Sequence, residues 1–113
     1  MIKYDSNNIF AKIIRKELPS KIFYEDDDVI VIYDINPVKK IHLLFIPKKP
    51  VINYDDFIEN STEIEISNFF KIINKVIKNL DIKNNYKLQA NSGSVCGQEV
   101  MHFHMHLMSP GVV

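Results

Sequence analysis

The sequence is poor in several residue types that would otherwise point to a class of protein. Cysteine occurs once, at Cys96, and tryptophan is absent. A single cysteine excludes a disulfide within the chain and is typical of a reducing compartment. The chain has no run of about 20 apolar residues that could span a bilayer. Its first residues, Met-Ile-Lys-Tyr-Asp, lack the apolar core of a secretory signal. We therefore expect a cytoplasmic protein that does not bind a membrane.

An excess of charge of one sign is also missing. Lys plus Arg and Asp plus Glu each number 14, so the formal net charge is zero with neutral histidine. Binding to nucleic acid usually needs a concentration of positive charge, and we expect no such partner. The apolar share of 46% is enough for the core of one domain at 113 residues. We expect that domain to span 1–113, with a flexible start at 1–8 and a short tail at 109–113.

Histidine is concentrated near the C-terminus. His102, His104 and His106 alternate with apolar residues, and this alternation predicts a β-strand whose two faces differ. The three imidazoles would then lie on one face, about 6–7 Å apart at a rise of about 3.3 Å per residue. Glu99 would point away from them if that strand were regular.

The other elements are predicted from periodicity, caps and breakers. Asn8 can cap a helix over 9–18 that Pro19 ends, and Thr62-x-x-Glu65 has the spacing of a capping box. The remaining predictions are strands at 22–25, 29–34, 41–46 and 86–91, a loop at 48–60 and a long helix at 63–80. Strands that meet in hairpins around one long helix indicate an antiparallel α+β sheet with helices on one face.

Histidines grouped on one face are suited to phosphate chemistry. One neutral imidazole can attack phosphorus, another can protonate the leaving group, and others can neutralise phosphoryl oxygens. His42 would join them if its strand is a neighbour. Two alternatives stay open on spacing alone: two histidines at i and i+2 with a third ligand can hold zinc, or the imidazoles lie on a solvated sheet face without a role.

The pattern His102-Phe-His104-Met-His106-Leu-Met108 resembles the motif of the histidine triad superfamily. Three further blocks, at 9–19, 33–37 and 42–48, resemble the same family in order and spacing, as does the lead-in at 91–100. The resemblance covers about 8–108. Its closest branch looks like Hint, the purine nucleoside phosphoramidases, and Gln98-Glu99-Val100 looks like the bacterial members.

The resemblance implies a fold, an assembly and an activity. The fold would be a HIT-like antiparallel meander with a short N-terminal helix and one long central helix on one face, and two protomers would join their sheets in a homodimer. The activity would be hydrolysis of the P–N bond in adenosine or guanosine 5′-phosphoramidates, which gives the nucleoside monophosphate and an amine. No metal or other cofactor would be required.

The resemblance also implies residue roles. His104 would be the nucleophile, His106 would contact the phosphate and assist the leaving group, and His42 and His102 would support them. Asp34 would bind the ribose hydroxyls. The purine pocket would comprise Ile9, Phe10, Ile13, Ile32, Tyr33 and Ile35, and the phosphate and ribose rim would comprise Asn91, Gly97, Gln98 and Glu99.

Two features depart from relatives, and two other functions stay open. Some Hint proteins carry Ser where Glu99 stands, and relatives often continue beyond the triad with a longer tail that reaches the leaving-group side. Dinucleoside polyphosphate hydrolysis is another activity of the superfamily. A nucleotide-binding interaction module with incidental hydrolysis is the third reading, because an intact triad serves both roles.

Overall fold

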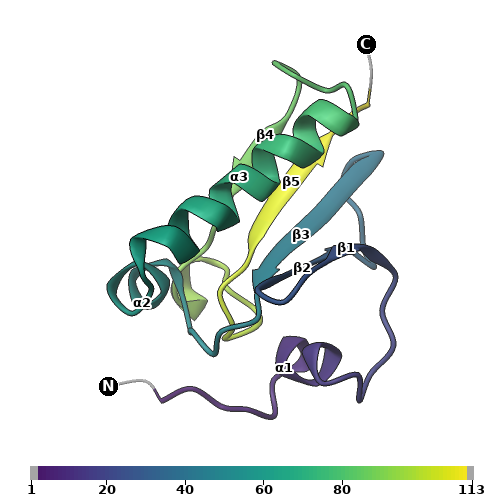
Figure 1. Ribbon diagram of the computed structural model, residues 1–113. Helices are drawn as coiled ribbons and strands as arrows, with labels where there is room; N and C mark the ends of the chain where they lie inside the picture. Colours follow the sequence, from purple (N-terminus) through teal and green to yellow (C-terminus); the bar gives the residue numbers. More distant parts are fainter. Residues whose placement is uncertain (1–2, 112–113) are drawn as a thin grey trace.

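In a computed structural model, which describes residues 3–111, a five-stranded antiparallel sheet organises the chain (Figure 1). The strands are β1 (Ile22–Glu25), β2 (Val29–Tyr33), β3 (Ile41–Pro47), β4 (Lys87–Gln89) and β5 (Met105–Ser109). Their order is β1-β2-β3-β5-β4, so the last strand lies between β3 and β4. The predicted antiparallel α+β fold is confirmed.

Among residues 3–111, three α-helices and one 3₁₀ turn complete the fold. They are α1 (Ile9–Ile14), α2 (Tyr54–Glu59), α3 (Glu63–Asn79) and η1 (Ser94–Cys96). The capping box of α3 forms as predicted: the Thr62 hydroxyl accepts from the Glu65 N–H, and the Glu65 carboxylate accepts from the Thr62 N–H. No helix among residues 3–111 combines the length and the apolar character needed to cross a membrane.

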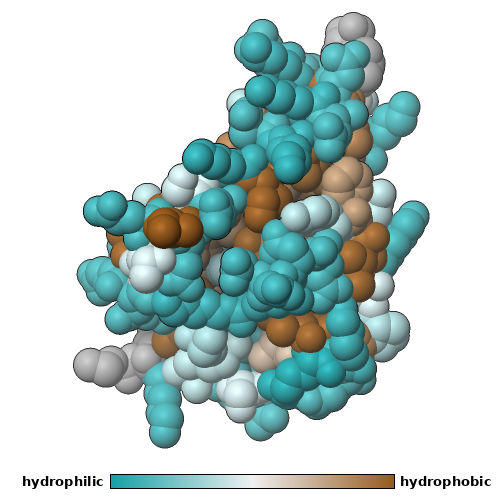
Figure 2. All heavy atoms as spheres, viewed as in Figure 1, coloured by the Kyte–Doolittle hydropathy of each residue, from teal (hydrophilic) through white to brown (hydrophobic). Residues whose placement is uncertain are grey.

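The two faces of the sheet bury different helices. Alternate residues of the central strands, among them Val31, Leu43 and Phe45, pack against the buried face of α3, and Figure 1 shows α3 lying along β5. The intervening residues, such as Ile30 and Leu44, pack against α1. This division follows from the period of two in a strand. The expectation that the helices lie on one face of the sheet is therefore wrong, because α1 and α3 cover opposite faces. In the view of Figure 2, hydrophilic residues cover most of the surface and hydrophobic ones show in smaller patches.

Several predicted boundaries are wrong. The first helix ends at Ile14 rather than residue 18, because Arg15 caps it and Lys16 adopts a left-handed conformation with φ 65°. The region 48–60, predicted as a loop, contains α2, which Asn53 caps through the N–H of Asp56. The strand predicted at 86–91 is confined to β4.

The histidine strand is shorter than the alternation predicts, because it begins only at Met105. The segment before it leaves the sheet: the Phe103 N–H donates to the Val51 carbonyl, 2.8 Å away, outside any strand pair. Only His106 of the three histidines therefore lies in a strand. Glu99 was predicted to point away from them only in a regular strand, and that condition is not met, because β5 does not include its segment.

The predicted ends of the domain fall partly outside the described residues, namely 1–2 and 112–113. Within the described part, the Tyr4 hydroxyl contacts His102. Ser109, predicted as the start of a tail, is the last residue of β5 and is fully buried, and its hydroxyl donates to the Asn85 carbonyl. The flexibility of the N-terminal segment stays a prediction.

Candidate active site

A cleft of about 360 Å³ lies on the α1 face of the sheet. Strand pairing forms its floor: His42 is opposite Met108, and Leu44 is opposite His106 on β5. On the other side of β5, Gln89 also faces His106. Side chains paired in this way share a face of the sheet. The floor therefore crosses three strands, β3, β5 and β4.

The structure brings together eight of the residues predicted for the site. They are Phe10, Asp34, His42, Asn91, Gly97, Glu99, His104 and His106. Six further lining residues were not predicted, namely Val38, Leu44, Lys87, Gln89, Val100 and Met108. Most of the six lie on the cleft face of a strand. The strand register that places them there depends on pairing between segments that are far apart in the sequence. Alternation within 41–46 and 106–108 is the one signal that could have found Leu44 and Met108.

Seven other predicted residues lie outside the cleft wall, and they fall into three groups. Ile13 and Ile32 are buried with Phe10 in the core beneath α1. Ile9, Tyr33 and Ile35 are exposed, Ile35 to 90%, and Tyr33 packs against Phe23. Gln98 and His102 are buried behind the cleft, where they hold its backbone in place. A role of His102 in supporting catalysis, and of the other six residues in nucleotide binding, stays a prediction.

Gln98 anchors the loop that forms one rim of the cleft. Its side-chain oxygen accepts from the Gly93 N–H, and its amide nitrogen donates to the carbonyls of Ile52 and Val100. Gly97 has φ +92°, a conformation that favours glycine, and a Cβ there would come within 3.4 Å of the Asn91 side chain. The loop therefore keeps its shape through a buried amide and a glycine.

The partners of His104 decide which of its nitrogens carries the proton. Its Nδ1 lies 2.8 Å from the carbonyl oxygen of His102, and a carbonyl can only accept. Nδ1 is therefore the donor, and in the neutral ring Nε2 keeps its lone pair. The ring packs edge-on against Phe10 and His106, with centroid distances of 4.9 and 5.1 Å. His104 is thus a nearly buried imidazole with one unprotonated nitrogen at a cleft.

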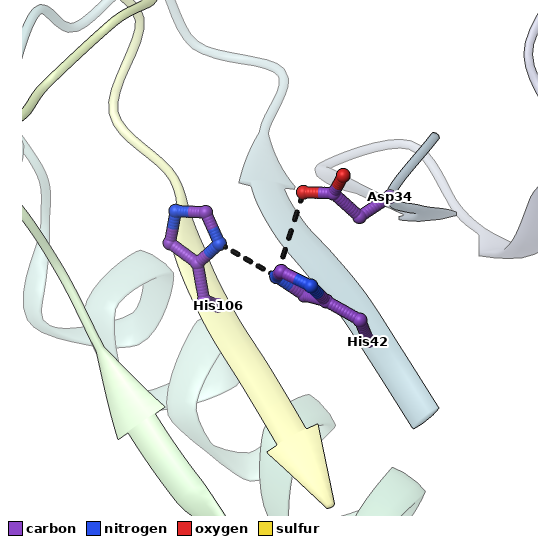
Figure 3. Close-up of side chains that lie close together, drawn as sticks. All are labelled: Asp34, His42 and His106. Atoms are coloured by element: carbon purple, nitrogen blue, oxygen red, sulfur yellow. Dashed lines mark hydrogen bonds and ion pairs between the residues drawn. The ribbon is translucent and has the colours of Figure 1, made fainter. Parts of the chain in front are cut away.

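A second chain of hydrogen bonds fixes His42 and His106. The Val38 N–H donates to His42 Nδ1 over 3.2 Å, so His42 carries its proton on Nε2. That nitrogen lies 2.9 Å from His106 Nδ1 and 3.4 Å from an Asp34 carboxylate oxygen. His106 Nδ1 is therefore the acceptor. The proton of neutral His106 is on Nε2, the nitrogen directed away from His42 (Figure 3).

His102 lies behind the cleft wall. It is fully buried, its Nε2 donates to the Pro47 carbonyl over 2.7 Å, and its Nδ1 accepts from the Tyr4 hydroxyl, also at 2.7 Å. Both ring nitrogens are therefore occupied. Its contribution to the cleft is its carbonyl, which holds the His104 ring.

Burial keeps three of these imidazoles neutral at neutral pH. Burial lowers the pKa of His102 to about 4, and burial together with the neighbouring His104 and His42 lowers the pKa of His106 to about 4. Burial also lowers the pKa of His104, while the negative charges of Asp34 and Glu99 act in the opposite direction. A positive charge that forms on His104 during a reaction would therefore be stabilised by two carboxylates.

One cluster at the site also has the chemistry of a metal ligand set. Single ligand atoms of Asp34, His42 and His106 lie within 4.8 Å of one another (Figure 3). Two nitrogens and a carboxylate oxygen suit a transition metal, but two of these atoms already form a hydrogen bond to each other. This set excludes His104, so it differs from the alternative considered from the i, i+2 spacing.

Comparison with known proteins finds HIT-like relatives over most of the length of this chain. A HIT-like protein of Rickettsia prowazekii is 40% identical over 106 residues, which cover 93% of this chain and 88% of that protein. The solved structure of a HIT family hydrolase from Clostridium thermocellum is 41% identical, with a TM-score of 0.80 and coverage of 96% and 93%. A histidine triad nucleotide-binding protein from Candida albicans gives 29% identity, a TM-score of 0.79 and coverage of 89% and 73%.

The family model of the HIT domain matches residues 15–111, which include β1 to β5 and all four histidines. The resemblance to the histidine triad superfamily inferred from the motif is thereby confirmed, and this chain belongs to the HIT domain family.

Proposed function

We propose that the protein hydrolyses the P–N bond of purine nucleoside 5′-phosphoramidates and releases the nucleoside monophosphate and an amine. The observation that carries the proposal is the lone pair left on Nε2 of His104 by the bond from its Nδ1 to the His102 carbonyl. Relatives described as a HIT family hydrolase and as a histidine triad nucleotide-binding protein support the reaction class and the ligand class.

In the first step, Nε2 of His104 attacks phosphorus and the P–N bond to the amine breaks. Splitting the hydrolysis through a covalent intermediate replaces one difficult step by two easier ones. The attacking ring becomes cationic, and its Nδ1–H remains bonded to the His102 carbonyl. Asp34 and Glu99 favour that charge. In the second step water attacks phosphorus and the bond from phosphorus to His104 Nε2 breaks, which releases the monophosphate and restores neutral His104. The proton lost by the water passes to His106 and replaces the one given to the amine.

The leaving amine needs a proton, and His106 is the group placed to give it. Its Nε2–H is the one that His42 leaves free, since His42 bonds to Nδ1. In the free protein the pKa of His106 is about 4. A phosphoryl anion beside the ring would raise that pKa, so that His106 could hold a proton at neutral pH and donate it to the amine. His42 would then share the added charge with Asp34.

The cleft also offers a seat for the nucleoside. Phe10, Leu44 and Val100 supply apolar surface for a base, and the Asp34 carboxylate is placed to accept from ribose hydroxyls. One Asp34 oxygen already accepts from the Asn36 N–H at 2.7 Å, which holds the group in position. Ile13 and Ile32 would act indirectly, because they support Phe10 from the core.

We further expect a homodimer that acts in the cytoplasm. The outer side of β4 forms an edge of the sheet, and Tyr86 and Leu88 beside that edge are 42% and 38% exposed. Pairing of two such edges would extend the sheet across a two-fold axis. Light scattering coupled to size-exclusion chromatography tests this expectation, and a monomer at micromolar concentration would contradict it.

The test of the activity is hydrolysis of adenosine 5′-phosphoramidate by the wild type and by His104→Ala, each with and without a chelator. We expect the substitution to lower kcat by at least about a thousandfold, as loss of a covalent nucleophile does in other enzymes. Ile64→Ala, which truncates an exposed residue of α3 outside the cleft, is the control and should keep full activity.

Other outcomes point to other functions. Turnover that survives His104→Ala refutes the nucleophile, and turnover lost only to the chelator indicates the metal set of Asp34, His42 and His106. A strong preference for a diadenosine polyphosphate over the phosphoramidate would indicate the other hydrolase of the superfamily. Tight binding of AMP without any turnover would leave a nucleotide-binding module.

A further inference from the structure

Lys87 occupies a place in the cleft that the proposed reaction does not use. It is the first residue of β4 and is exposed, and its side chain lines the cleft. Its strand partner is Met108 of β5, which is also the partner of His42 on β3. Lys87 therefore lies on the same face as His42 and His106, on the outermost strand of the floor.

The charge of Lys87 is available to a ligand. Among the described residues that line the cleft, it is the one with a permanent positive charge, and Asp34 and Glu99 supply the carboxylates. Within residues 3–111 no ion pair engages Lys87, whereas Lys16 and Lys48 are paired with Glu25. The neighbouring amide of Gln89 donates one of its two N–H groups to Asn91 at 3.3 Å, and it carries no charge.

The proposed proton donor links Lys87 to the leaving amine. Lys87 is opposite Met108 on β5, and Met108 follows His106 by two residues on the same face. Lys87 is therefore a diagonal cross-strand neighbour of His106, at a spacing of about 7–8 Å that a long side chain can bridge. A substituent of an amine that takes its proton from His106 would lie within reach of Lys87.

We propose that Lys87 is a specificity residue that binds an anionic substituent of the leaving amine. The preferred leaving amines would carry a carboxylate two bonds from the nitrogen, as α-amino acids do. This inference rests on the proposed function and deepens it. The bonds and protons change as in the proposed reaction. The P–N bond breaks, the nitrogen takes a proton from His106, and water supplies the oxygen of the monophosphate. Lys87 supplies charge and exchanges no proton.

Two substrates of matched size test the proposal: the adenosine 5′-phosphoramidates of glycine, which has a carboxylate, and of glycinamide, which is neutral there. Each variant is compared with the wild type on the same substrate, so the intrinsic reactivities of the two amines cancel. We expect Lys87→Gln to lower kcat/KM for the glycine compound about tenfold, as loss of one charge-assisted hydrogen bond would. For the glycinamide compound, kcat/KM should change by less than about twofold. Lys87→Arg keeps the charge and should keep the preference.

Lys71→Gln is the matched control, because Lys71 lies on α3 away from the cleft. This variant should leave kcat/KM unchanged for both substrates. An equal loss on both substrates in Lys87→Gln overturns the inference and assigns Lys87 to the phosphoryl group. No change on either substrate overturns it as well. In both cases wild-type turnover leaves the proposed function standing, whereas wild-type inactivity on both compounds refutes the proposed function itself.

Discussion

The buried imidazole of His102 should make the stability of the fold depend on pH in a defined window. The folded protein keeps this ring neutral until the pH falls to about 4, while an unfolded chain protonates it near its ordinary pKa of about 6.5. Between these values the unfolded state binds more protons than the folded state. The free energy of unfolding therefore decreases as the pH falls through this window, and the contribution of His102 is complete above it.

The magnitude follows from the two pKa values. With about 4 in the folded state and 6.5 in the unfolded state, His102 alone lowers the free energy of unfolding by about 2 kcal/mol between pH 7 and pH 5. A loss of that size is a large fraction of the stability of a small domain, which is typically about 5–15 kcal/mol. Carboxylates such as Glu25 and Asp26, whose pKa values are lowered, contribute mainly below this range.

Urea unfolding of the wild type and of His102→Gln at pH 7 and pH 5 measures the effect. The variant removes the titrating group and retains an amide N–H that can face the Pro47 carbonyl. We expect the wild type to lose about 2 kcal/mol more than the variant between the two pH values, because the other histidines are common to both. Equal losses would refute the reasoning, as would an NMR titration of the His102 ring with a midpoint near 6.5.

Three further predictions concern separate parts of the structure. Thr62→Ala should cost about 1 kcal/mol of unfolding free energy through loss of the α3 cap, whereas Ser61→Ala, whose buried hydroxyl has no partner within the described residues, should cost nothing in the same urea titration. Phe103→Ala should cost about 3–5 kcal/mol, because the ring stacks on Phe57 at 5.0 Å and is buried; thermal unfolding checks this. Glu99→Gln should move the acid limb of the kcat/KM profile to lower pH, since the carboxylate raises the pKa of His104; an unmoved limb would place Glu99 away from the ring.

The parts of the fold that could be predicted from sequence are those with local causes. The long helix has an apolar period and a capping box within its own residues, and both are present in α3. The central strands are apolar along nearly their whole length because both of their faces are buried, one against α3 and one against α1. Those signals need no knowledge of which strands are neighbours.

The parts that could not be predicted depend on contacts between distant segments. Lys87 and Gln89 enter the cleft because β4 pairs with the strand of His106, although the two helices α2 and α3 separate β3 from β4 in the sequence. Glu99 lines the cleft because its segment is held by Gln98, which bonds to Ile52. The predicted Ile35 lies on a turn that exposes it to 90%, and nothing in its apolar character distinguishes that position from a pocket wall.

The break before β5 explains why three equally spaced histidines have three different environments. In a continued strand the His102 carbonyl would accept from a backbone N–H of a neighbouring strand. The pairing of β3 with β5 ends at Phe45 and Met105, and the bond from Phe103 to Val51 draws the preceding segment away. The His102 carbonyl is thereby free to accept from the ring of His104. The alternation in the sequence thus supplies the imidazoles, and one long-range backbone bond frees the carbonyl that sets the tautomer of His104, the nucleophile of the proposed reaction.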